Sequence, residues 1–295
     1  MKFLTLLIFP QVFLFMIGLQ GSPEKIQPNI LWLVVEDQSK HYGFNGEKLV
    51  HTPVLDELAG NGVRFTNASV TAPVCSTARS ALITGMYQTS IGAHHHRSGR
   101  GEVKIQKPGH IKLIPELFQK AGYYTCLGSN VHGAGTASPK HQSRLGKSDY
   151  NFEWNPSVFD AAEWSGRKKG QPFFAKICLN GGKARSQARA SKHIPHVDTS
   201  KVVLPPYYPR HQVVLEDWAA YLDTFSLMDF QVGQIIDRLK KEGEFKNTII
   251  FFITDHGVSH ARGKQFCYDE GMMIPFFVHA PNRVKGGMVR NDPVL

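Results

Sequence analysis

Two short apolar segments, residues 29–35 and 248–254, constrain the fold more than any other feature of the sequence. Their sequences, NILWLVV and TIIFFIT, are continuous hydrophobic runs rich in β-branched and aromatic side chains. A run of this length without polar alternation is typical of a strand that is buried on both faces of a sheet. Such a strand requires helices on both sides, which favours an α/β architecture.

Other expected strands and helices alternate with these two segments. The further strands predicted are residues 123–127, 173–179 and 274–278. Amphipathic helices are predicted for residues 111–121 and 212–241, because their apolar side chains recur at helical spacing. We therefore expect an α/β fold with a largely parallel central sheet flanked by helices on both faces. Two polar stretches, residues 129–144 and 181–209, are expected to be loops.

Charged and polar side chains follow both apolar segments. Glu36 and Asp37 come directly after the first, and Asp255 and His256 follow the second. The carboxyl ends of parallel strands meet at one edge of a sheet, where ligands bind in open α/β folds. Three carboxylates gathered there need a compensating cation, and oxygen ligands favour Ca²⁺ or Mg²⁺ over Zn²⁺. Because imidazole is a poor ligand for such cations, a hydrogen bond from His256 to an anionic substrate group is the alternative.

A cysteine stands at the predicted start of another helix. Cys75 lies in the segment PVCSTARSALITGMY, and Arg79 follows one helical turn later. The first turn of a helix and a nearby guanidinium both stabilise negative charge. The position therefore suits a thiolate or the binding of an anion.

This segment resembles the signature of type I sulfatases, members of the alkaline phosphatase-like superfamily. The family pattern is Cys-x-(Pro/Ala)-x-Arg followed by Thr-Gly-x-Tyr, and Thr77 departs from it where Pro or Ala is usual. The resemblance implies that a formylglycine-generating enzyme oxidises Cys75 to formylglycine, whose hydrated aldehyde is the nucleophile. It also implies that Arg79 helps to hold that group.

The resemblance extends to the two strand ends and implies a metal site there. In the family, an acidic pair after the first strand, a later Asp-Asn or Asp-His pair and the formylglycine hold a divalent cation, usually calcium. Magnesium is the alternative. The residues at these positions are Glu36, Asp37, Cys75, Asp255 and His256.

Two lysines match family positions that contact the sulfate. Lys264 lies in GKQFCYDEG, and Lys147 lies in GKSDYNF. The two histidines usual in the family have no clear counterparts: Asp149 or His132 could stand at one position, and Lys183 stands near the other. The catalytic residues implied are Cys75, Arg79, Lys147, His256 and Lys264.

The N-terminus has the pattern of a secretory signal. Lys2 precedes an apolar stretch, residues 3–19, followed by small residues, so we predict a signal peptide over residues 1–21 and an alternative uncleaved anchor. The protein is then secreted to an extracellular, lysosomal or periplasmic space. A net charge of +10 favours an acidic partner. No dense basic block interleaved with aromatic residues is present, so a nucleic acid is not expected, and neither is a stable membrane partner.

The sequence thus favours a sulfuric-ester hydrolase that acts on a sulfated carbohydrate or related ester. The alternatives are a phosphodiesterase or phosphonate hydrolase of the same superfamily, and a truncated, non-catalytic binder of sulfated glycans. Residues 27–295 are predicted to form the N-terminal catalytic domain of a sulfatase. The resemblance implies a further C-terminal subdomain that this sequence lacks. On that interpretation, the isolated chain would be poorly soluble or weakly active.

Overall fold

A computed structural model describes residues 27–98, 101–129 and 145–295 of the chain. The predicted signal peptide, residues 1–21, lies outside the described residues. The same holds for His132 and for most of the stretch 129–144 that was expected to be a loop.

The core of the protein is a seven-stranded sheet with the strand order β3-β4-β1-β5-β6-β2-β7. The strands are β1 (Asn29–Val35), β2 (Val63–Phe65), β3 (Tyr124–Ser129), β4 (Phe173–Leu179), β5 (Thr248–Thr254), β6 (Phe276–His279) and β7 (Met288–Arg290). The first four strands in this order are mutually parallel, whereas β6 runs antiparallel to both of its neighbours. The prediction of an α/β fold with a largely parallel sheet is confirmed.

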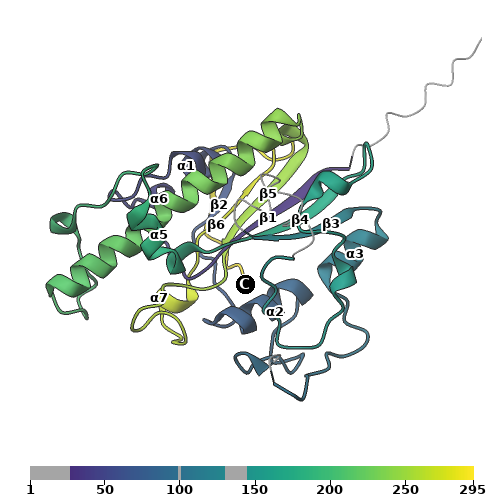
Figure 1. Cartoon of the computed structure of the whole chain (residues 1–295), viewed down its shortest axis with the longest axis horizontal. Coiled ribbons are helices and arrows are strands. Elements are labelled where there is room, and N and C mark those ends of the chain that lie inside the picture. Colours follow the sequence, from purple (N-terminus) through teal and green to yellow (C-terminus); the bar gives the residue numbers. More distant parts are fainter. Residues whose placement is uncertain (1–26, 99–100, 130–144) are drawn as a thin grey trace, which may run out of the picture.

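Helices cover both faces of this sheet (Figure 1). The helices are α1 (Pro53–Gly60), α2 (Cys75–Thr84), α3 (Ile114–Lys120), α5 (Arg185–Ala190), α6 (Gln212–Lys241) and α7 (Asp269–Met272). Helices α1 and α6 lie on one face, and α2 and α3 lie on the other. Within the described residues, no helix is both long enough and apolar enough to span a membrane.

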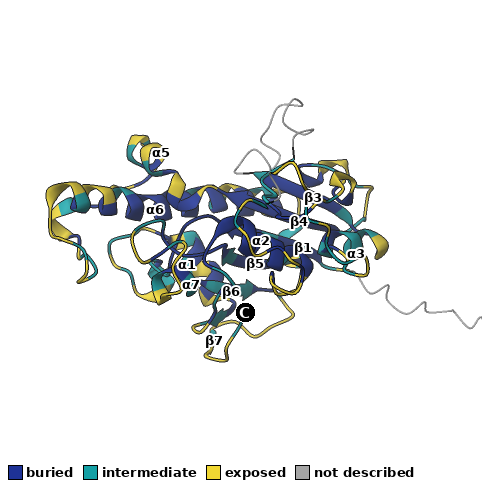
Figure 2. Cartoon of the chain, turned by 90° about the horizontal axis from the view of Figure 1, so that it is seen from below, coloured by how far each residue is buried: buried dark blue, intermediate teal, exposed yellow. Residues whose placement is uncertain are grey.

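Strand β1 explains why both faces need cover. Its side chains alternate between two hydrophobic clusters. Leu31 and Leu33 belong to the cluster that includes residues of α1 and α6, whereas Ile30 and Trp32 pack against the cluster that Phe118 of α3 also covers. Successive side chains of a strand point to opposite faces, so an apolar run has two surfaces to bury. Figure 2 shows the result: the strands and the inner side of α6 are buried, whereas the outer turns of the helices are exposed.

Several predicted boundaries differ from the structure. The strand expected at 274–278 is β6, Phe276–His279, and it is antiparallel to β5. The segment from β5 to β6 contains only the short helix α7 and no crossover helix to the other end of the sheet, so the chain must run back. The helix expected at 111–121 is shorter because it starts with Ile114, beside Pro115 at the helix N-terminus. The stretch 181–209 is not simply a loop, because it contains α5.

A cavity of about 380 Å³ lies between α2 and strands β5 and β6. Its walls are mainly apolar and include Trp32, Phe251, Ile253 and Phe276. No lysine or arginine of the described chain lines it, so it does not suit an anionic ligand.

A buried lysine lies in the middle of β4. Lys176 is inaccessible to solvent, and its Nζ donates to Tyr150 Oη at 3.2 Å, with the ammonium also 5.0 Å from the centre of that ring. Burial lowers the pKa of Lys176 from its ordinary 10.5 to about 8. Below pH 8 the lysine is charged in both states and its burial opposes folding. Between pH 8 and 10.5 the unfolded chain binds the extra proton, so stability rises with pH.

We therefore expect Lys176→Met to stabilise the fold at pH 7 by about 1–2 kcal/mol. This figure allows for the loss of the hydrogen bond to Tyr150, which costs about 1 kcal/mol. The gain should shrink toward zero as the pH approaches 10.5. Urea denaturation of both proteins at pH 7 and pH 10 measures this difference. An equal difference at both pH values would contradict the assigned cost of burying the charge.

Candidate active site

Three parallel strands end side by side and bring their following residues together. In the sheet register, Val35 of β1 lies opposite both Leu179 of β4 and Thr254 of β5. The residues that follow these strands therefore meet at one edge of the sheet, as the sequence predicted for the first and third of them.

A glycine pair after β4 permits a close approach to the acidic pair after β1. The amide of Gly182 donates to the carbonyl of Glu36 at 2.8 Å. A Cβ added at Gly181 would lie 2.1 Å from Glu36 O, and one at Gly182 would lie 2.2 Å from Asp37 O. Gly181 also has a φ of +46°, a conformation that favours glycine. This contact places the next residue, Lys183, over the carboxylates.

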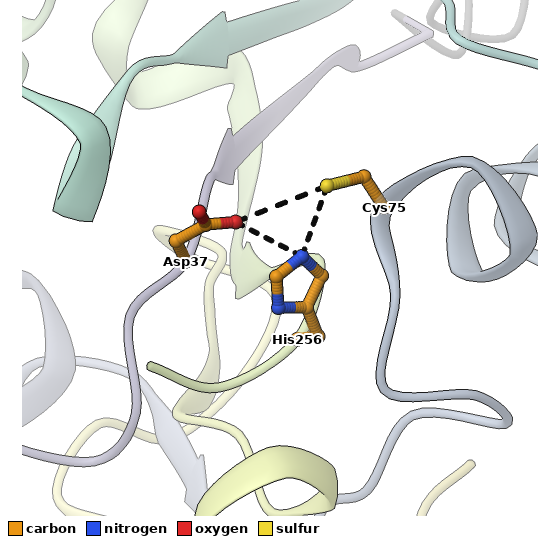
Figure 3. A group of neighbouring side chains, drawn as sticks. All are labelled: Asp37, Cys75 and His256. Carbon is orange, nitrogen blue, oxygen red and sulfur yellow. Dashed lines mark hydrogen bonds and ion pairs between the residues drawn. The ribbon is translucent and has the colours of Figure 1, made fainter. Parts of the chain in front are cut away.

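Cys75 begins α2 and points into the same edge of the sheet. Only 1% of the residue is exposed, and its Sγ lies 3.1 Å from His256 Nε2 and 3.8 Å from Asp37 Oδ1. Figure 3 shows the three side chains converging from different parts of the chain. Burial is the largest influence on the pKa of the Cys75 thiol and raises it, but the hydrogen bond and the positive charge of His256 act against burial and the net pKa is lowered. The position therefore favours negative charge on residue 75, as the helix start predicted.

Arg79 contacts one carboxylate from each of the two strand-end pairs. It is completely buried, and its Nε donates to Asp255 Oδ2 at 2.9 Å, whereas its Nη2 lies 3.4 Å from Glu36 Oε1. Its Nη1 donates to Cys178 Sγ at 3.1 Å. Burial disfavours the charged guanidinium, but Asp255 and the other partners raise the pKa of Arg79 further above its usual range. Arg79 is therefore a permanent buried cation.

Three lysines surround the same carboxylates. Lys264 Nζ lies 3.1 and 3.3 Å from the two oxygens of Asp37 and 3.0 Å from Cys75 Sγ. Lys147 Nζ lies 2.9 Å from Glu36 Oε1, and Lys183 Nζ donates to Glu36 Oε2 and lies 3.8 Å from Asp37 Oδ1. Protein cations, namely the three lysines and Arg79, therefore also compensate these carboxylates, in addition to the divalent cation that the sequence predicts.

A divalent cation nevertheless fits a smaller set of donors. Ligand atoms of Asp37, Cys75 and His256 lie within 4.8 Å of one another. His256 Nδ1 donates to Gly257 O at 2.8 Å, which directs Nε2 toward the other two donors. In metal sites, a hydrogen bond from the ring nitrogen that does not bind the metal orients the histidine in this way. Asp255 adjoins the set, with Oδ1 3.4 Å from His256 Nε2.

Glu36 lies outside this donor set. Both of its oxygens contact lysines, so it could reach a cation only by releasing one of them. The role of Glu36 as a metal ligand remains a prediction.

His256 carries a positive charge when no metal is bound. Burial disfavours the charged form of His256, but Asp255, Asp37 and Cys75 raise the pKa of His256 to about 10. Without a metal, the imidazolium supplies positive charge at the centre of the set.

Two residues of the site were not assigned a role from the sequence. Lys183 was noted only as the residue near a family histidine position, and the preceding glycine pair was the signal that the chain approaches the acidic residues closely. Cys178 lies in the apolar segment 173–179, which by itself indicates only buried packing. It is buried, but its Sγ also accepts a hydrogen bond from Arg79 Nη1 and lies 3.2 Å from Lys147 O. Asp149 lies beside the site, with Oδ2 3.6 Å from Lys147 Nζ.

The chain belongs to the sulfatase family, whose family model, described as Sulfatase, matches residues 28–293. The family prediction made from the Cys75 segment is confirmed.

Similar proteins include an "Ulvan-active sulfatase" of Formosa agariphila, which is 30% identical over 92% of this chain and 50% of the relative. The solved structure of Ps i-CgsB in complex with k-i-k-neocarrahexaose has a TM-score of 0.62 and 23% identity, over 91% of this chain and 69% of that one. Phosphonate monoester hydrolase SpPMH from Silicibacter pomeroyi has a TM-score of 0.60 and 16% identity, over 90% and 70%. The chain spans about half the length of the first curated relatives, 50% and 51%.

Proposed function

We propose that this protein hydrolyses a sulfate ester of a carbohydrate through a formylglycine made from Cys75. The observation that carries the proposal is the placement of Cys75 in a sulfatase-family chain: its Sγ lies 3.0 Å from Lys264 Nζ and 3.1 Å from His256 Nε2 at the start of α2. Once oxidised by a formylglycine-generating enzyme, residue 75 would supply a hydrated aldehyde oxygen as the nucleophile.

The charges around residue 75 suit a sulfate group. Lys264 and Lys183 lie next to residue 75, with Nζ atoms 3.0 and 3.8 Å from its Sγ, and Lys147 contacts Glu36. All three lysines are partly exposed. Their ammonium groups can offset the charge of the sulfate and the charge that develops as the alcohol leaves. Arg79 is too deeply buried to contact a substrate. Its contacts with Asp255 and Glu36 instead favour a role in holding these two carboxylates in position.

We further propose that Asp37, His256 and residue 75 hold a divalent cation, with Asp255 beside them and Glu36 as the predicted additional ligand. Calcium is the first candidate and magnesium the alternative, because the donors are mainly oxygens. A cation bound there would polarise the oxygens of the sulfate.

Chelation should lower both the activity and the melting temperature. A ligand that binds only the folded state stabilises it by about 2.7 kcal/mol at a concentration one hundred times its Kd. Because protein cations also compensate the carboxylates, the chelated protein should still unfold cooperatively. The check is a melting curve and a rate measurement before and after EDTA, followed by re-addition of Ca²⁺ or Mg²⁺. The absence of bound calcium or magnesium, together with no effect of EDTA, would contradict the metal site.

We propose that the chain is exported, because residues 1–21 have the pattern of a cleavable signal. N-terminal sequencing of protein from the medium or periplasm of an expressing cell tests this. A chain that retains Met1 and stays in the cytoplasm would contradict it.

The second candidate function is phosphonate or phosphodiester hydrolysis. The likeness to SpPMH favours it as a fold-level analogy. Rates on an aryl sulfate, an aryl phosphonate and an aryl phosphodiester, measured on one preparation, separate the two functions. The proposal expects the aryl sulfate to react fastest, and a faster aryl phosphonate would overturn it.

The third candidate is a non-catalytic binder of sulfated glycans. Thr77 favours it, since it departs from the family signature and is buried in the first turn of α2. Lys183 also favours it, because it occupies the site beside Glu36. Binding of a sulfated glycan without turnover of any sulfate ester would establish this function and exclude the first.

A further inference from the structure

An exposed group of aromatic side chains and one arginine lies beside the candidate active site. The group, here called the aromatic platform, consists of Tyr207, Arg262, Phe266 and Tyr268. The guanidinium carbon of Arg262 lies 3.9 Å from the centre of the Tyr268 ring and 5.0 Å from that of Tyr207. The rings of Phe266 and Tyr268 stack at 6.3 Å. All three rings are 40–49% exposed, so this is a surface feature and not part of the core.

A hydrogen bond joins the two segments that form the platform. Tyr208 Oη donates to Ala261 O at 2.6 Å, which ties the segment of Tyr207 to that of Arg262. A Cβ at Gly263 would lie 2.1 Å from Val258 O, so the chain after Arg262 is closely packed. The relative position of the aromatic side chains is therefore set by the fold.

The same segment carries a residue of the candidate active site. Lys264, which contacts Cys75, lies between Arg262 and Phe266. Its amide donates to Val258 O, and the amide of Gln265 donates to Pro73 O, both at 2.7 Å. Pro73 lies two residues before Cys75. The platform is consequently anchored to the segment that presents the nucleophile.

We propose that the aromatic platform binds a sugar ring of a sulfated oligosaccharide, next to the ring whose sulfate is cleaved. This inference rests on the proposed function and specifies its substrate as an oligomer with a second anionic group. The electron-rich face of an aromatic ring attracts the polarised C–H groups on one face of a sugar ring. Large exposed apolar side chains that cluster on a surface commonly mark a binding site.

The charge of Arg262 selects the kind of sugar. Within the described residues, no carboxylate forms an ion pair with Arg262, whose recorded partners are the two tyrosine rings. A guanidinium in this state can pair with a sulfate or carboxylate of the ligand while it remains stacked. The net charge of +10 also favours a polyanion.

Binding can be tested without turnover in the Cys75→Ala chain. The probes are sulfated tetrasaccharides from ulvan and from chondroitin sulfate, with sulfated monosaccharides for comparison, and calorimetry gives each Kd. At least one tetrasaccharide should bind about tenfold more tightly than its monosaccharide, and the added change Tyr207→Ala/Tyr268→Ala should remove that advantage. Arg262→Ala should weaken tetrasaccharide binding about threefold or more, whereas Tyr268→Phe, which keeps the ring, should bind normally.

Leu117→Ala and Arg283→Ala are matched controls, since these exposed side chains lie on α3 and beside Asn247, away from the platform. The inference is overturned if no tetrasaccharide binds, if the monosaccharide binds equally well, or if the platform variants bind like the controls. Failure of the proposed function is recognised by a different measurement. In that case the unsubstituted protein would not hydrolyse an aryl sulfate, whether or not the tetrasaccharides bind.

Discussion

Cys75→Ala should abolish hydrolysis of an aryl sulfate while leaving the fold intact. The substitution removes the side chain from which the nucleophile is made, so the rate should fall by at least ~10³-fold. Alanine is a good helix former and the residue begins α2, so the melting temperature should change by only a few degrees. Rates on 4-methylumbelliferyl sulfate and thermal melting of the two proteins measure both effects.

Cys126→Ala is the matched control for this result. Cys126 is also a free, buried cysteine, but it lies in β3 within the hydrophobic cluster that contains α6. Its loss should lower stability by about 1 kcal/mol and leave the rate per folded molecule unchanged. Unchanged turnover in Cys75→Ala would refute the mechanism.

Arg79→Met should have the largest effect on stability. It removes the only guanidinium that contacts Asp255 among the described residues and leaves that carboxylate, which is 2% exposed, without its closest cation. Loss of one partner of a buried ion pair typically costs about 3–5 kcal/mol. For a chain of this size that corresponds to a fall in melting temperature of roughly 10 °C. Urea denaturation gives the change in free energy directly.

Arg290→Met provides the comparison for a surface ion pair. Arg290 pairs with Asp292 at 2.7 Å, but both side chains are more than half exposed, so the substitution should have little effect on stability. A similar effect of both substitutions would mean that Arg79 does not act as a buried counter-ion.

The parts of the fold that the sequence predicted correctly are those whose pattern is local. Strands β1, β4 and β5 and helix α6 have the predicted bounds, because each strand is a continuous apolar run and the helix is a long segment with helical spacing of its apolar residues. The three-residue strands β2 and β7 were not predicted, since such a segment is too short to show a period. The direction of β6 was not predicted either, because it depends on where the intervening segment lies and not on the strand's own residues.

The candidate site divides in the same way. Acidic residues at strand ends and a cysteine at a helix start are visible in the sequence, and the structure brings Glu36, Asp37, Cys75 and Asp255 together. The environment of their charges is not visible. Lys183 reaches Glu36 only because β4 lies beside β1, and a lysine considered alone is usually a solvated side chain. The sequence therefore predicted which of these residues lie together better than it predicted the balance of charge around them.

Mass spectrometry of the peptide that contains residue 75 tests the central claim most directly. The measurement is made on purified protein whose rate on an aryl sulfate is known, from cells that contain a formylglycine-generating enzyme. The account predicts that residue 75 has lost sulfur and two hydrogens and gained one oxygen, in a fraction that rises in proportion to the rate. A fully active preparation in which residue 75 is entirely an unmodified cysteine would contradict it.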